Sequence, residues 1–161
     1  MYSSQTTGLP TAGKVNVLGT ADMLWVINYY DNDGRNIKTY SQHYFGGGGA
    51  LNKYNYDLVT TTYNFDGQPL IVTRQNYVKN AGGTAATLAL TVTNSYTYDH
   101  MGRKTISYNQ LRHQLLTSQA TVAISKETYN DIGQVIKKGL HSLTPYTGFI
   151  QNIDYRYNER G

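Results

Sequence analysis

The 161-residue sequence contains no cysteine. A disulfide framework and a thiolate metal site both need cysteine side chains, so both are excluded. The absence leaves the cellular compartment open, because many bacterial surface proteins and many cytosolic proteins lack this residue.

Charged residues and the usual helix-forming residues are scarce. Asp, Glu, Lys and Arg make up 15% of the chain, against about 25% in an average globular protein, and Glu occurs only at Glu127 and Glu159. Tyr (16 residues), Thr and Val favour strands, while Asn, Asp and Gly favour turns. The composition therefore predicts an all-β protein. The net charge of +4 is spread along the chain, so we expect no nucleic-acid partner, which would need a clustered basic patch.

Long hydrophobic runs are also missing. The longest uninterrupted apolar stretch is the five residues 23–27, whereas a helix that crosses a bilayer needs about 20. We therefore expect no membrane insertion. The first residues are polar and uncharged, unlike a signal peptide, and we interpret Met1 as a start within a longer protein.

What the chain does contain is a repeated pattern, Tyr-[Asp/Asn]-x-x-Gly. Its five copies span residues 30–34, 63–67, 98–102, 129–133 and 157–161, and successive glycines are 33, 35, 31 and 28 positions apart. The defining residues are Tyr30, Asp31 and Gly34; Tyr63, Asn64 and Gly67; Tyr98, Asp99 and Gly102; Tyr129, Asn130 and Gly133; and Tyr157, Asn158 and Gly161. The residue after the glycine is Arg35, Gln68, Arg103 or Gln134. Regular recurrence of this kind predicts a tandem array of one supersecondary unit.

The chemistry of the pattern is that of a β-hairpin turn. Asp or Asn accepts a hydrogen bond from the backbone two residues on, and Gly provides the positive φ of a bulge that follows a type I turn. The tyrosine ends the incoming strand, where it can pack across the strand pair on an apolar residue beyond the turn. We expect Tyr30 near Ile37 and Tyr129 near Ile136.

The array predicts paired strands joined by variable connectors. Strands are expected at about 24–30 with 35–42, 58–63 with 68–77, 92–98 with 103–109, 123–129 with 134–141, and 150–157, with another short strand at 14–19. Residues 45–50 and 79–86 are expected to be flexible loops, 109–119 to contain a turn of helix, and 1–13 to be a flexible N-terminal stretch. The whole of 1–161 is expected to be one repeat segment. Because the fifth copy stops at Gly161, we expect the chain to be part of a longer array.

The Tyr-Asp-x-x-Gly-Arg signature at residues 30–35 and 98–103 resembles the YD repeat of bacterial RHS-repeat proteins, and the resemblance covers residues 14–161. It implies tandem antiparallel YD hairpins in a twisted, spiral-like sheet that forms a hollow shell. It further implies a non-catalytic structural segment of a large secreted or cell-surface bacterial protein. The partners implied are neighbouring YD repeats of the parent chain and an enclosed C-terminal effector or toxin.

The sequence contains no recognisable catalytic or cofactor motif. The histidines (His43, His100, His113 and His141) lack metal-ligand spacing. Residues 31–34 resemble the start of a calcium loop, but position 12 is Gln42, where the loop needs Glu. We therefore expect no enzymatic activity, no metal and no cofactor.

The tyrosines allow a second interpretation. In most positions they are explained by cross-strand packing, but exposed rings can also stack on sugars. The candidates for glycan stacking are Tyr29, Tyr40, Tyr44, Tyr54 and Tyr56. A carbohydrate- or protein-binding module is thus the alternative function. In either case an unpaired sheet edge is expected to favour an edge-strand homo-oligomer.

Overall fold

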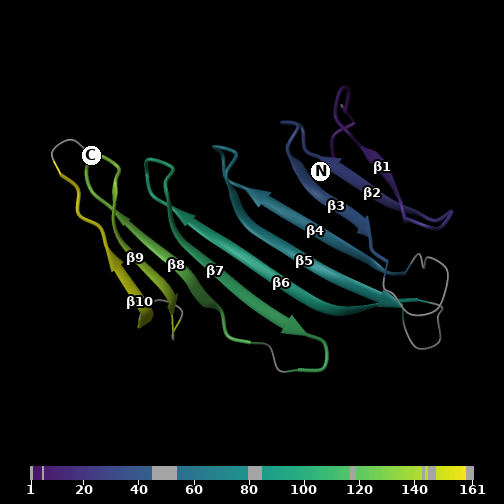
Figure 1. Ribbon diagram of the computed structural model, residues 1–161. Helices are drawn as coiled ribbons and strands as arrows, with labels where there is room; N and C mark the ends of the chain where they lie inside the picture. Colours follow the sequence, from purple (N-terminus) through teal and green to yellow (C-terminus); the bar gives the residue numbers. More distant parts are fainter. Residues whose placement is uncertain are drawn as a thin grey trace.

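In the part of the chain that the structure describes, ten β-strands form one antiparallel sheet and lie in it in the order of the chain (Figure 1). The computed structural model describes residues 2–4, 6–44, 54–79, 85–116, 119–142, 144 and 148–158. The strands are β1 Ala12–Asn16, β2 Met23–Tyr30, β3 Asn36–Gln42, β4 Tyr56–Tyr63, β5 Pro69–Lys79, β6 Ala86–Tyr98, β7 Lys104–His113, β8 Val122–Tyr129, β9 Val135–Ser142 and β10 Phe149–Asp154. The described residues contain no helix, and β1 and β10 do not pair to close the sheet. The prediction of an all-β, twisted sheet of antiparallel hairpins is confirmed.

Four copies of the repeated pattern form the turns β2–β3, β4–β5, β6–β7 and β8–β9, which lie along the upper edge of the sheet in Figure 1. Their glycines have φ between 76° and 87°, so the predicted positive φ is confirmed. In the first turn, the Gly34 amide donates to the Asp31 carbonyl at 3.2 Å, and the Asp31 amide donates to the Arg35 carbonyl at 3.0 Å. Gly161 of the fifth copy lies outside the described residues.

A bulge beside each repeat tyrosine changes the expected pairing. The register shifts between Tyr29 and Tyr30 and at the equivalent place in the other three hairpins. Tyr30 therefore lies opposite Asn36 instead of Ile37, and Tyr129 lies opposite Val135 instead of Ile136. The apolar residue is the extra residue of the bulge and has no partner directly opposite it.

The strand ends that the connectors join lie at the other edge of the sheet, away from the repeat turns (Figure 1). The expected loop at 45–50 and residues 80–84 fall outside the described residues, but Lys79 belongs to β5 and Ala86 to β6. The turn of helix expected within 109–119 is wrong for the part that the structure describes, because β7 continues to His113 and a turn follows. Pairing of Leu111 with Val92 of β6 overrides the local helical spacing.

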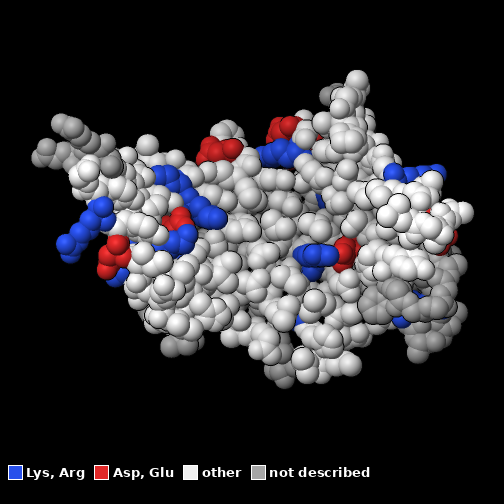
Figure 2. Space-filling view, in the orientation of Figure 1, with Lys and Arg blue, Asp and Glu red and all other residues white. Residues whose placement is uncertain are grey.

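The sheet is a single layer with almost no interior. Among the described hydrophobic residues only Tyr30 and Ala123 are buried. The chain exposes 10971 Å², whereas a compact monomer of its mass exposes about 8,000 Å². Charged side chains on the face in view stand singly or in small groups (Figure 2). The fold thus depends on strand pairing and on contacts within each face.

Side-chain alternation gives the sheet two distinct faces. The register places Trp25, Ile27, Tyr29, Tyr40 and Tyr56 on one face, which we call the ladder face. The opposite face, called the amide face, carries Asn28, Thr39, Asp57 and Asn76, together with the repeat tyrosines.

The N-terminal residues form half of a further hairpin. Gly8 has φ +80° like the repeat glycines. Ala12, four residues after Gly8, pairs with Ile27 of β2, just as Lys38, four residues after Gly34, pairs with Thr60 of β4. The stretch 1–13 thus includes the first residues of β1, Ala12 and Gly13. In its structural role β1 is an outgoing strand, equivalent to β3.

Candidate functional site

The repeat tyrosines join each hairpin to the one before it. Each hydroxyl crosses to a backbone carbonyl of the preceding outgoing strand, two residues after that hairpin's glycine. The bonds are Tyr30 to Pro10 (2.9 Å), Tyr63 to Asn36 (2.8 Å), Tyr98 to Pro69 (2.8 Å), Tyr129 to Lys104 (2.9 Å) and Tyr157 to Val135 (2.8 Å). These five bonds tie all the hairpins into one unit.

Within each turn, the second and sixth pattern residues form a matched pair. Asp31 Oδ2 accepts from Arg35 Nε at 2.7 Å, and the pair Asp99–Arg103 repeats this distance. In the other two turns the side-chain amide of Asn donates to Gln Oε1. Those bonds are Asn64 to Gln68 (2.8 Å) and Asn130 to Gln134 (2.9 Å). In each turn, therefore, an Asp is paired with an Arg, or an Asn is paired with a Gln.

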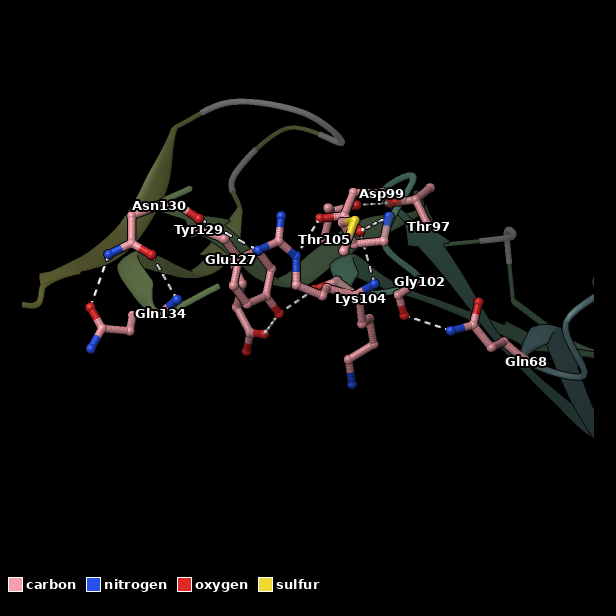
Figure 3. Close-up of polar contacts among 12 residues, drawn as sticks. Gln68, Thr97, Asp99, Gly102, Lys104, Thr105, Glu127, Tyr129, Asn130 and Gln134 are labelled. Atoms are coloured by element: carbon pink, nitrogen blue, oxygen red, sulfur yellow. Dashed lines mark hydrogen bonds and ion pairs between the residues drawn. The ribbon is translucent and has the colours of Figure 1, made fainter. Parts of the chain in front are cut away.

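The same Arg or Gln also reaches the next turn. Arg35 Nη1 donates to the Asn64 carbonyl at 3.3 Å, and Gln68 Nε2 donates to the Gly102 carbonyl (Figure 3). Arg103 Nη1 donates to the Asn130 carbonyl at 3.5 Å, and its guanidinium lies 4.6 Å from the centre of the Tyr129 ring. We call these tyrosine, turn-pair and next-turn contacts the turn network.

The acids of the turn network have lowered pKa values. Partial desolvation raises the pKa of Asp31, but hydrogen bonds from the Arg35 backbone and side chain and from the Asp33 amide outweigh it. The pKa of Asp99 is lowered by the same balance. Both carboxylates are ionised acceptors with occupied oxygens, and the turn chemistry accounts for them fully.

A second polar group lies on the amide face. Asp57 is buried, with an exposed fraction of 6%, and its oxygens accept from Arg74 and, at 2.8 Å, from Asn76. Burial raises the pKa of Asp57, but these two partners lower it further, so the net shift is downward. Asn76 Nδ2 is also 3.1 Å from His43 Nε2. Asp57 therefore acts as a hydrogen-bond acceptor for its neighbours, and its lowered pKa makes it a poor proton donor.

Three of the five candidate glycan-stacking tyrosines come together on the ladder face. Tyr29, Tyr40 and Tyr56 line an open hollow of about 620 Å³, together with Trp25, Ile27 and Gln42. Tyr44 and Tyr54 do not line it. Sequence reasoning missed Trp25, Ile27 and Gln42, although their alternation with Tyr29 and Tyr40 is visible in the sequence.

The rings around the hollow form a continuous ladder. Ring centres are 5.0 Å apart for Tyr2–Tyr29, 6.1 Å for Tyr29–Tyr40, 5.7 Å for Tyr40–Tyr56 and 4.7 Å for Tyr56–Tyr77. Only the last pair is stacked, at 16°. Two ammonium groups lie on this ladder: Lys14 is 4.2 Å from the centre of the Trp25 ring and Lys38 is 4.9 Å from that of Tyr40. Much of the ring surface thus contacts other side chains of the protein.

Metal ligands do not gather among the described residues, where no group of three or more His, Asp or Glu is placed to hold an ion. The same residues form no helix that is long and apolar enough to cross a membrane. No protein-family model matches the chain, and no curated protein sequence matches it.

Proposed function

We propose that the chain is a non-catalytic structural segment of an RHS/YD-repeat shell. The shell would belong to a large secreted or cell-surface bacterial protein and would enclose a C-terminal effector. The resemblance of the Tyr-Asp-x-x-Gly-Arg signature to YD repeats is the source of the proposal. The observation that carries it is the series of five equivalent tyrosine bonds, each of which ties one hairpin to the preceding one.

A wall with an inside and an outside is expected to have two faces of different composition, and the two faces of this sheet differ. The ladder face carries Trp25, Ile27 and the ladder of tyrosine rings, whereas the amide face carries the repeat tyrosines together with hydrogen-bonded Asn, Thr and Asp. The area exposed above that of a compact monomer is roughly 2,900 Å². In a shell, an enclosed partner would cover part of this area.

The test compares the two faces by thiol labelling, which is clean because the chain has no cysteine. Ile71 lies on the ladder face and Leu111 on the amide face, with similar exposed fractions of 43% and 41%. Ile71→Cys and Leu111→Cys are introduced one at a time, in the 161-residue chain and in the intact secreted protein. Both should react with a bulky maleimide at similar rates in the chain alone.

In the intact protein, one position should be protected and the other should still react, because a shell separates inside from outside. The protected position should become reactive once the shell is opened by proteolysis. Equal labelling of both positions in the intact protein would refute the proposal that the sheet is part of a shell wall.

A second function, glycan binding on the ladder face, is favoured by the hollow around Tyr40. Its rings offer flat apolar faces with polar tips, which suit sugar stacking. A glycan array should give hits that Tyr40→Ala and Trp25→Ala abolish, whereas Tyr96→Ala on the amide face should retain them. An array without hits at millimolar ligand would refute glycan binding, and it would not bear on the proposal that the chain is part of a shell.

A further inference from the structure

The two ends of the sheet are opposite halves of one hairpin. At the N-terminal end, β1 behaves as an outgoing strand: the Tyr30 hydroxyl donates to the Pro10 carbonyl just as Tyr63 donates to that of Asn36. Gly8, two residues before Pro10, has the φ of a repeat glycine. Residues 8–16 therefore correspond to residues 34–42.

At the C-terminal end, β10 behaves as an incoming strand. It runs antiparallel to β9, and the Tyr157 hydroxyl donates to the Val135 carbonyl two residues after Gly133. Tyr157 thus corresponds to Tyr30, and Asp154 corresponds to Ile27.

Both strands are paired on one side only within the described chain. β1 pairs with β2, and β10 pairs with β9. Their outer backbone groups are therefore available as a template for another strand. In every complete hairpin, an incoming strand is followed in the sheet by an outgoing one.

We propose that copies of this chain associate head to tail, with β10 of one copy pairing antiparallel with β1 of the next. We choose a second copy as the partner of the β10 edge because β10 has the form of an incoming strand and the β1 strand of another copy has the form of the matching outgoing strand. The proposal concerns the 161-residue chain, since in a longer array the neighbouring repeats would pair with the same two edges.

The register of β2 with β3 fixes the contacts across this junction. Ile27 lies opposite Tyr40, so Asp154 lies opposite Lys14 of the next copy. Both side chains are exposed, and neither forms an ion pair with another described residue. Opposite charges at directly opposed positions favour this register over neighbouring ones. Since the two edges differ, each added copy leaves a new β10 edge, and assembly does not close at a dimer.

The experiment measures mass against protein concentration by light scattering and sedimentation. The wild-type chain should grow past the dimer as its concentration rises. Asp154→Lys alone and Lys14→Asp alone should each weaken association about three- to tenfold, because like charges then lie opposite one another. Mixing the two variants should restore association, since every junction in an alternating chain again joins opposite charges.

The outcomes separate this geometry from others. A strictly monomeric chain, or a mass that stops at the dimer, overturns the proposal. An effect of Asp154→Lys without an effect of Lys14→Asp would indicate β10–β10 pairing and overturns it too. Circular dichroism of each variant should match wild type, because both positions are exposed.

A cysteine pair provides a second measurement. Lys14→Cys with Asp154→Cys in one chain should give a ladder of disulfide-linked oligomers on oxidation. In the control, Lys14→Cys is combined with Ile153→Cys, which a one-residue slip places on the opposite face, and no ladder should form. Equal ladders from both pairs would show random contact and count against the register.

Discussion

Removing one repeat hydroxyl should measure how strongly adjacent hairpins are joined. The Tyr98 hydroxyl donates to the Pro69 carbonyl at 2.8 Å, and Tyr98→Phe removes this bond while keeping the ring. A hydrogen bond of this kind contributes about 1 kcal/mol to folding, which for a chain of this size lowers Tm by about 2–4 °C. Urea unfolding followed by circular dichroism gives the free energy of unfolding directly.

The matched control is Tyr96→Phe. Tyr96 lies two residues away on the same face, its ring is 5.5 Å from the Lys104 ammonium, and its hydroxyl makes no hydrogen bond to another described residue. Its replacement should leave stability within about 0.5 kcal/mol of wild type. The double variant Tyr63→Phe with Tyr98→Phe should lose about 2 kcal/mol, because the two hydroxyls share no partner. If Tyr98→Phe is as stable as Tyr96→Phe, the tyrosine bonds do not hold the hairpins together.

Three further predictions concern the turns and the last strand. Gly102→Ala should destabilise the chain more than Gly19→Ala. Both glycines have positive φ, but a Cβ at Gly102 would lie 2.9 Å from Gln68 Nε2, whereas one at Gly19 meets nothing within 4 Å. The Gln68 side chain would therefore have to move, and it would lose its hydrogen bond to the Gly102 carbonyl. Equal free energies of unfolding would contradict this. Gly139→Ala should speed amide exchange in β10, because a Cβ there would lie 2.7 Å from the Phe149 ring; unchanged exchange would mean that the ring moves without cost. The paired replacement Asp31→Asn with Arg35→Gln copies the amide pairs of the other turns and should fold normally. Because the pKa of Asp31 is lowered from 3.8 in the folded chain, its stabilisation is present above that value and is lost as pH falls through the folded pKa. The paired variant should therefore lose less stability on acidification than wild type, and an identical pH profile would count against the ion pair.

Local chemistry made the hairpin turns predictable. The Asp or Asn, the Gly and the residue after it act within six positions of one another, so their geometry depends little on the rest of the chain. Pairing of Asp with Arg and of Asn with Gln was also visible at this spacing in all four complete copies. From the sequence alone, the change from Asp and Arg to Asn and Gln resembles random variation of the repeat. The structure shows that the two positions change together because their side chains bond to each other, as at Asn64 and Gln68.

Predictions failed where strand pairing overrode a local signal. Leu111 and Leu115 have helical spacing, but pairing with β6 extends β7 to His113. Gly8 lacks the preceding Tyr and Asp of the repeat, so the half-hairpin was recognised from the φ of Gly8, the Tyr30–Pro10 bond and the pairing of Ala12 with Ile27.

The sequence by itself determined where the hairpin strands lie, the positive φ of the turn glycines and the number of complete hairpins, because these follow from alternation and from short-range hydrogen bonds. Only the tertiary structure decided which tyrosines meet. Tyr29, Tyr40 and Tyr56 come from three strands, and they share one hollow because the register between strands sets which side chains share a face. Tyr44 and Tyr54 do not line that hollow. That register depends on bulges and on hydroxyl bonds between hairpins, which join residues 20 to 29 positions apart.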